Sequence, residues 1–274
     1  MTNAADADGP TRPDGAHPAD GPFSFAGTTT LVVGGSSGIG HAVARTLLAL
    51  DGRVLIASRS AAKLASARDR LVAGGADAAG IETRAVDTTD PAGVDALFAG
   101  LEPGSLDHLV VTASRSVHGP FADVPVADVE AMFASKFFGP YRVVKEALPT
   151  VRDGGSIALF SGVLSRRPGV NTVGLGAVNG AVEALARGLA LELGPRVRVN
   201  CISPGMVRTE VYDGMPAERR EAMYAATGAS LPLGRVGEPD EIALATVAAL
   251  ANPYLTGQVI DIDGGHTIRQ YATR

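Results

Sequence analysis

The stretch Val32-Val33-Gly34-Gly35-Ser36-Ser37-Gly38-Ile39-Gly40-His41 leads from an apolar run through a glycine-rich turn into a helical pattern. Leu31 to Val33 have the composition of a buried parallel strand, and apolar residues recur on one face of a helix from His41 to Leu50. A second strand is predicted at Arg53 to Ala57. The stretch is therefore the first turn of a strand-helix-strand unit.

The spacing of the glycines indicates what this turn is for. Gly34 and Gly38 allow a tight turn and the close approach of a diphosphate, and Gly40 lets the helix lie against the strand. The free N–H groups at the start of the helix can then bind an anion. In this context the pattern predicts dinucleotide binding rather than a purely structural turn.

Strands and helices alternate along the rest of the chain. The predicted strands are 29–33, 53–57, 82–86, 106–112, 156–161, 196–202 and 259–262, and the predicted helices lie near 41–50, 61–73, 91–101, 126–149, 174–193 and 239–250. This alternation predicts an α/β fold with a doubly wound parallel sheet of the Rossmann type, flanked by helices on both faces. We expect one such domain over residues 23–274.

The composition of the chain limits the classes of protein to which it can belong. Residues 1–22 are rich in proline, glycine and aspartate, so we expect a disordered tail that is not a signal peptide. A net charge of −5 gives no basic footprint for nucleic acid or an anionic membrane surface, and no apolar run is long enough to span a bilayer. The single cysteine, Cys201, lies in a strand pattern and is expected to be a buried thiol, which fits a reducing cytoplasm.

The glycine spacing resembles that of the short-chain dehydrogenase/reductase family, and the resemblance extends from about Phe25 to Gly265. Thr112-Ala113-Ser114 stands where the family has Asn-Ala-Gly, so only the alanine is kept. Ser203 to Thr209 resembles the family's Pro-Gly segment, which holds the nicotinamide carboxamide. Thr256 to Gly265 resembles the closing strand and its glycine turn.

The end of the second strand bears on the choice of nucleotide. Ser58 stands where NAD users of the family have aspartate, and Arg59 follows it. A guanidinium binds the extra phosphate of NADP bidentately, and no carboxylate is present here to repel that phosphate. We therefore expect NADP(H), although a solvated arginine at the start of a helix is the alternative.

Other residues complete the expected cofactor site by resemblance. Asp87 would bond the adenine amino group, with an ordinary helix cap as the alternative, although Asp90 before Pro91 is the better cap. The full set expected to bind the cofactor is Gly34, Ser36, Ser37, Gly38, Ile39, Gly40, Ser58, Arg59, Asp87, Thr88, Ala113, Ser114, Asn179, Pro204, Gly205, Val207 and Thr209. No metal site is expected.

The catalytic residues of the family are not found where the resemblance places them. The family uses a tyrosine, a lysine four residues later on the same helix, and a serine thirteen residues before the tyrosine. Aligned without a gap, these positions hold Leu175, Asn179 and Gly162. A literal Tyr-x-x-x-Lys occurs at Tyr141 to Lys145, but it lies in the preceding helix and is rejected.

Three residues could rebuild a catalytic site. Lys136 stands where the family has a helical asparagine, and either enters the site or extends into solvent. The hydroxyl of Ser161 either bonds a substrate oxygen or bonds its own backbone. Asn179 can donate an amide N–H to the ribose but brings no charge.

Two further segments would border the pocket. Arg166 and Arg167 either bind an acidic substrate or are merely solvated. Residues 207–233 fall where the family carries a mobile lid over the substrate.

These observations leave three functions open. The first is an NADP-dependent oxidoreductase acting on a small carbonyl or alcohol with a rebuilt proton donor. The second is a non-redox enzyme such as a cyclase, isomerase or dehydratase, and the third is a nucleotide-binding or regulatory protein. The glycine- and alanine-rich helix 174–193 pairs subunits in the family, which implies a homodimer or homotetramer. The alanine- and glycine-heavy composition is typical of a GC-rich bacterial source.

Overall fold

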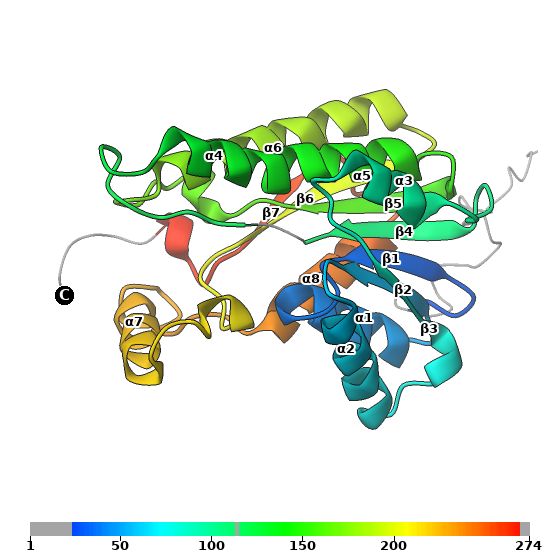
Figure 1. Cartoon of the computed structure of the whole chain (residues 1–274), viewed down its shortest axis with the longest axis horizontal. Coiled ribbons are helices and arrows are strands. Elements are labelled where there is room, and N and C mark those ends of the chain that lie inside the picture. The colour runs from blue at the N-terminus through cyan, green and yellow to red at the C-terminus, as the bar shows by residue number, and fades with distance from the viewer. Residues whose placement is uncertain (1–23, 113–114, 269–274) are drawn as a thin grey trace, which may run out of the picture.

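Seven parallel strands form one sheet in the order β3-β2-β1-β4-β5-β6-β7 (Figure 1). The computed structural model describes residues 24–112 and 115–268; the expected tail 1–22, Ala113 and Ser114 lie outside the described residues. The strands are β1 (Thr29–Val33), β2 (Arg53–Ser58), β3 (Ile81–Ala85), β4 (Leu106–Val111), β5 (Val151–Phe160), β6 (Arg198–Pro204) and β7 (Val259–Ile262). The doubly wound parallel sheet predicted from the sequence is confirmed.

Helices cover both faces of this sheet (Figure 1). One face carries α3 (Pro91–Phe98), α4 (Val126–Phe133), α5 (Gly139–Ala147) and α6 (Val173–Leu193). The other carries α1 (Gly38–Ala49), α2 (Ala61–Ala73) and α8 (Pro239–Ala251), while α7 (Ala217–Ala229) stands beyond the ends of the strands. Short helical turns occur at Ala78–Gly80, Val163–Ser165, Glu210–Tyr212 and His266–Ile268.

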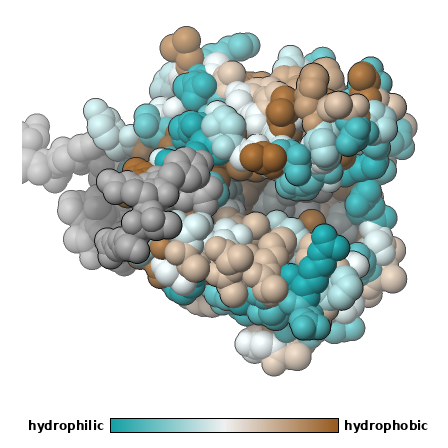
Figure 2. Space-filling model, turned by 90° about the vertical axis from the view of Figure 1, so that its left-hand side faces the viewer, coloured by the Kyte–Doolittle hydropathy of each residue, from teal (hydrophilic) through white to brown (hydrophobic). Residues whose placement is uncertain are grey.

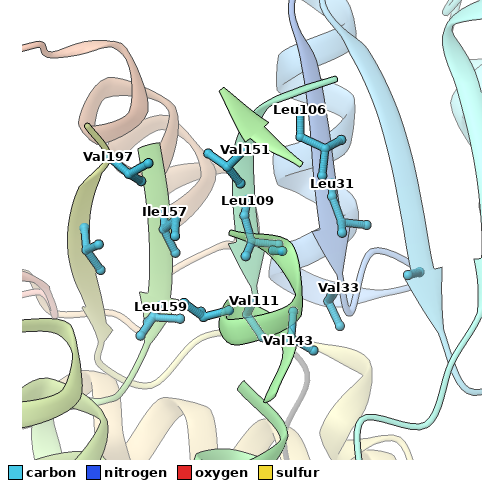
Figure 3. Close-up of a cluster of buried hydrophobic side chains, with 14 of the residues drawn as sticks. Leu31, Val33, Leu106, Leu109, Val111, Val143, Val151, Ile157, Leu159 and Val197 are labelled. Atoms are coloured by element: carbon cyan, nitrogen blue, oxygen red, sulfur yellow. The ribbon is translucent and has the colours of Figure 1, made fainter. Parts of the chain in front are cut away.

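The strands alternate their side chains between two hydrophobic cores, one under each helical layer. In β1, Leu31 and Val33 pack into the core beneath α3, α5 and α6, and Val32 between them packs into the core beneath α1, α2 and α8. Figure 3 shows the first of these cores, where side chains from β1, β4 and β5 meet Val143 of α5. Burial on both faces explains why the central strands read as continuous apolar runs.

The structure differs from the prediction in two helical regions and in one strand. The helix predicted at 126–149 is interrupted by a π-helical turn at Ala134–Phe138, which separates α4 from α5. Helix α7 was not predicted as an element, and β5 begins earlier than expected, at Val151.

The strand order places a switch point between β1 and β4, because the chain proceeds outward from β1 to β3 on one side and returns to β4 on the other. Ligands of such sheets bind beyond the carboxyl ends of the strands at this point. Figure 2 views the molecule from the left-hand side of Figure 1, where α7 lies, and shows a surface hollowed between an upper and a lower part.

Candidate functional site

The glycine turn after β1 has the tight geometry that the sequence predicts. Gly34 and Gly38 have φ angles of +94° and +53°, which favour glycine. A Cβ atom at Gly40 would lie 2.4 Å from the Gly34 carbonyl oxygen and 2.7 Å from Oγ1 of Thr112. Helix α1 therefore begins in direct contact with the turn.

The other residues of the turn have different surroundings. Ser36 is buried, and its carbonyl oxygen accepts a hydrogen bond of 2.9 Å from Arg70 of α2. Ser37 is the extended residue before α1, and its side chain makes no capping hydrogen bond. Ile39 packs against the core beneath α1.

The carboxyl end of β2 carries the residues expected at the adenosine ribose. The Ser58 hydroxyl is buried and has no hydrogen-bond partner within the described part of the chain. Arg59 is exposed, and no ion pair or hydrogen bond of its guanidinium is found with any other described residue. Both groups are thus available to a ligand.

Asp87 and Thr88 follow β3. Oδ1 of Asp87 accepts hydrogen bonds from the backbone N–H and the hydroxyl of Thr89, at 2.9 and 2.8 Å. These bonds, aided by the nearby charge of Arg59, lower the pKa of Asp87. Thr88 is buried against α5, where a Cβ at Gly139 would lie 2.6 Å from its hydroxyl. The cap of α3 is Asp90, as the sequence predicts.

The segment after β6 returns to the glycine turn. Pro204 ends β6, and a Cβ at Gly205 would lie 2.9 Å from Cα of Asp263. Val207 is buried and forms an isolated parallel bridge with Gly237. Thr209 lies over the first residue of α1, since a Cβ at Gly38 would be 3.3 Å from its methyl group.

Lys136, Ser161 and Asn179 meet at the end of β5, from three different elements. Nζ of Lys136 donates a hydrogen bond of 3.2 Å to the Ser161 carbonyl oxygen, and Nδ2 of Asn179 donates one of 3.1 Å to the next carbonyl, that of Gly162. Lys136 is only 7% exposed, so it does not extend into solvent. The π-helical turn between α4 and α5 directs this lysine inward.

Burial determines the protonation state in this cluster. It lowers the pKa of the Lys136 ammonium to about 8. The neighbouring thiol of Cys201 on β6 is fully buried, which raises its pKa to about 11 and keeps it neutral near pH 7. Lys136 can therefore exchange a proton near neutral pH.

Leu175 and Gly162 border the same place without offering a proton. Leu175 is 7% exposed and packs with Met132 and Val178 in a small apolar cluster. A Cβ at Gly162 would lie 3.0 Å from Nδ2 of Asn179. The Oδ1 atom of Asn179 is buried and has no partner in the described residues.

Sequence reasoning missed a carboxylate in this cluster. Glu183 of α6 is 5% exposed and accepts hydrogen bonds from the hydroxyls of Ser161, at 3.2 Å, and Ser165, at 2.5 Å. The Ser161 hydroxyl therefore bonds the Glu183 carboxylate and not its own backbone. Glu183 lies four residues after Asn179 on the same face of an apolar helix, and this spacing is the signal in the sequence that could have revealed it.

The arginines after β5 are held by the protein itself. Arg166 forms ion pairs with Glu183, at 3.3 Å, and with Asp261 of β7, and it donates a hydrogen bond of 2.9 Å to the Ser203 hydroxyl. Arg167 donates to the Thr267 carbonyl at 3.2 Å. The literal pair at Tyr141 and Lys145 lies on the outer side of α5, and Tyr141 is 48% exposed.

The described residues also lack two other kinds of feature. Over 24–112 and 115–268, no three His, Cys, Asp or Glu side chains are grouped as metal ligands would be. None of the helices in these ranges has the length and apolar composition needed to cross a bilayer.

Similarity to known proteins extends over most of the chain. Residues 33–267 match the family model described as enoyl-(acyl carrier protein) reductase. A short-chain dehydrogenase/reductase from Stachybotrys chlorohalonatus is 30% identical over 250 residues, covering 88% of this chain and 98% of the relative.

Two solved structures share the architecture as well. A small-chain dehydrogenase in complex with NADPH has a TM-score of 0.73 and 37% identity, covering 87% of this chain and 97% of its own. The MalC reductase/Diels-Alderase from Malbranchea aurantiaca has a TM-score of 0.82 and 28% identity, covering 90% and 99%. Identity at this level over nearly the whole length, joined to one parallel sheet and one glycine turn, means that the chain belongs to the short-chain dehydrogenase/reductase family of oxidoreductases.

Proposed function

We propose that this protein is an NADP(H)-dependent oxidoreductase that acts on a small carbonyl or alcohol substrate through a non-standard catalytic site. The observation that carries the proposal is Lys136, a buried ammonium with a pKa of about 8 at the end of β5. The preference for NADP(H) rests on the surroundings of Arg59.

The residues present fit a dinucleotide. The glycine turn offers backbone N–H groups to a diphosphate, and the orphaned Ser58 hydroxyl and Asn179 amide oxygen offer polar atoms to the two riboses. Arg59 offers a guanidinium that is free among the described residues to the additional phosphate of NADP. The small-chain dehydrogenase that binds NADPH, similar to this chain in sequence and fold, supports the same choice.

The catalytic part of the proposal concerns the residues that stand at the positions of the family's catalytic residues. In the alignment with the family, Leu175, Asn179 and Gly162 take the places of the tyrosine, lysine and serine. None of these side chains can donate a proton to an alkoxide as a phenol does, because leucine and glycine have no donor and an amide is a very weak acid. Another acid is therefore needed for carbonyl reduction.

Lys136 fits that need. The nicotinamide, when bound, supplies hydride transfer. An ammonium with a pKa of about 8 is mostly protonated at pH 7 and close enough to neutrality to give up its proton. One of its three N–H groups is used by the Ser161 carbonyl, which leaves two for a substrate oxygen or an intervening water.

A second candidate function is a non-redox reaction on the same fold. The MalC protein is named as both a reductase and a Diels-Alderase, so this architecture accommodates cyclisation chemistry. In this chain, the apolar cluster of Met132, Leu175 and Val178 would orient an apolar substrate without a proton donor. A protein that only binds nucleotide is the remaining alternative.

The first test is a fluorescence titration of the purified protein with NADPH and with NADH. We expect Arg59→Asp to weaken NADPH binding about tenfold or more while changing NADH binding little, because only NADPH carries the extra phosphate. Arg53→Asp, at the opposite end of β2, is the matched control. Equal losses for both nucleotides would contradict the assignment of Arg59, and no binding of either would favour the non-redox or regulatory function.

The second test is turnover with NADPH and a panel of carbonyl compounds. Lys136→Ala is expected to lower kcat roughly a hundredfold or more, since a general acid contributes about that much. Lys145→Ala, an exposed lysine on α5, serves as the control. If Lys136→Ala keeps full activity, Lys136 is not the acid.

We also propose that the protein assembles as a homodimer or homotetramer through α6. Gly180 and Gly188 of this helix have nothing within 4 Å of where a Cβ would stand, and Leu191 on the next turn is 88% exposed. A face of small residues allows two such helices to approach closely. A cytoplasmic location stays a prediction.

A further inference from the structure

The glycine turn is already engaged by a carboxylate of the protein itself. The backbone N–H of Gly38, the first residue of α1, donates a hydrogen bond of 2.8 Å to Oε2 of Glu210. A Cβ at Gly38 would lie 3.3 Å from the Thr209 methyl group and 3.5 Å from the same carboxylate oxygen. The segment that follows β6 therefore stands directly over the position where a diphosphate would bind.

The carboxylate is held there by α1 rather than by a cation. No ion pair of Glu210 with Lys or Arg is present in the described residues. His41 is close by, but burial and the charge of Arg70 lower its pKa, so it is neutral near pH 7. The attraction thus comes from the backbone N–H and the positive end of the α1 dipole, which also attract a phosphate.

The rest of the segment is anchored away from the turn. The backbone of Arg208 pairs with Gly237, its guanidinium forms an ion pair of 2.7 Å with Glu221 of α7, and it lies 4.4 Å from the ring of Tyr224. Tyr212 packs edge-on against the same ring, with 5.7 Å between ring centroids. These contacts fix both ends of a short stretch and leave Glu210 between them as the part that meets the cofactor site.

We propose that Glu210 is an internal competitor of the cofactor: its carboxylate closes the diphosphate position in the cofactor-free protein and must leave when the dinucleotide binds. Two anions cannot accept the same N–H hydrogen bond, so each binding event includes the displacement of Glu210. The Glu210 side chain therefore moves when the cofactor enters, while the stretch that carries it stays joined to α7 through Arg208 and Tyr212. The inference rests on the proposed dinucleotide function of this site.

The competition has a measurable size. If the Glu210 contact is formed in about nine molecules of ten, the apparent affinity for the cofactor is reduced about tenfold, because only the open fraction binds. Glu210→Gln removes the negative charge at nearly constant volume. Glu218→Gln is the matched control, since Glu218 is an exposed glutamate on the first turn of α7.

The experiment measures dissociation constants of the full-length protein and the two variants for NADPH and for inorganic pyrophosphate. We expect Glu210→Gln to bind both ligands about three- to tenfold more tightly than the parent protein, and Glu218→Gln to bind them as the parent does. Pyrophosphate is included because it contains the competing group without the nicotinamide or the adenosine.

The outcomes separate the inference from the proposed function. NADPH binding that is equal or weaker in Glu210→Gln than in the parent overturns the inference and leaves the function standing. Tighter pyrophosphate binding by Glu210→Gln without NADPH binding by any variant overturns the function and supports the competition. If no variant binds either ligand, both are wrong.

Discussion

The burial of Lys136, on which its proposed role as an acid rests, is unfavourable for stability. Its ammonium is buried at the end of β5, and its neighbours there are a carbonyl oxygen and a neutral thiol rather than a directly paired carboxylate. Its contact with a carboxylate is indirect: the carbonyl of Ser161 accepts from Lys136, and the hydroxyl of Ser161 donates to Glu183. A buried charge with indirect compensation is unfavourable for folding.

Replacing this charge should therefore stabilise the protein in a pH-dependent way. The pKa of Lys136 is about 8 in the folded protein, against about 10.4 for an unperturbed lysine, so the unfolded chain binds more protons between these values. Stability of the parent protein accordingly rises with pH from about 8 to about 10. Lys136→Met should raise the free energy of unfolding at pH 7 by roughly 1–3 kcal/mol, and the gain should shrink towards pH 10.

Denaturant unfolding at pH 7 and at about pH 9.5 measures both effects. Lys145→Met, which removes an exposed lysine from α5, should change stability by less than about 0.5 kcal/mol at either pH. A loss of stability in Lys136→Met at pH 7 would mean that the ammonium is compensated better than its contacts indicate.

At the scale of elements, the sequence predicted those strands and helices whose positions follow from hydrophobic periodicity and burial. The central strands were found because residues such as Leu31, Val32 and Val33 are apolar on both faces. The limits of several strands shifted by a few residues, since the hydrogen-bonded register and not hydropathy decides where a strand ends. Helix α7 was missed because its buried residues are only Tyr224 and Gly228, too few to give a helical apolar pattern.

The π-helical turn between α4 and α5 is a more informative miss. The sequence predicted one continuous helix and left open whether Lys136 enters the site or extends into solvent. The π-helical turn is what brings Lys136 into the site. Pro140 was a usable signal, because proline lacks the N–H that would bond the carbonyl four residues earlier in an uninterrupted helix.

The contacts that define the candidate site were the least predictable. Glu210 and Gly38 are separated by 172 residues, and Arg166 is separated by 95 residues from Asp261 of β7, with which it forms an ion pair. Pairings of this kind follow from where the sheet brings its strand ends, and a single sequence contains no local pattern for them. The residues of the glycine turn could be named in advance because their spacing alone specifies their backbone geometry.

At the scale of the whole molecule, the two cores are coupled because they share one sheet. Ile157 of β5 faces the core beneath α5 and α6, whereas Ile56 of β2 faces the core beneath α1 and α2. Both side chains are completely buried, and three strand spacings of about 4.8 Å separate β2 from β5. Neither core can be lost without uncovering strands that the other core needs.

Cavity-forming substitutions on opposite faces should therefore lower the midpoint of one common transition. Ile56→Val and Ile157→Val should each cost roughly 0.5–1.5 kcal/mol, and the double variant should lose about the sum, because the two sites share no contacts. Urea unfolding followed by far-ultraviolet circular dichroism and by tyrosine fluorescence should give coincident curves in all four proteins. Two separate transitions, with each substitution affecting only one, would show that the faces unfold independently and that the sheet does not transmit the loss of one core to the other.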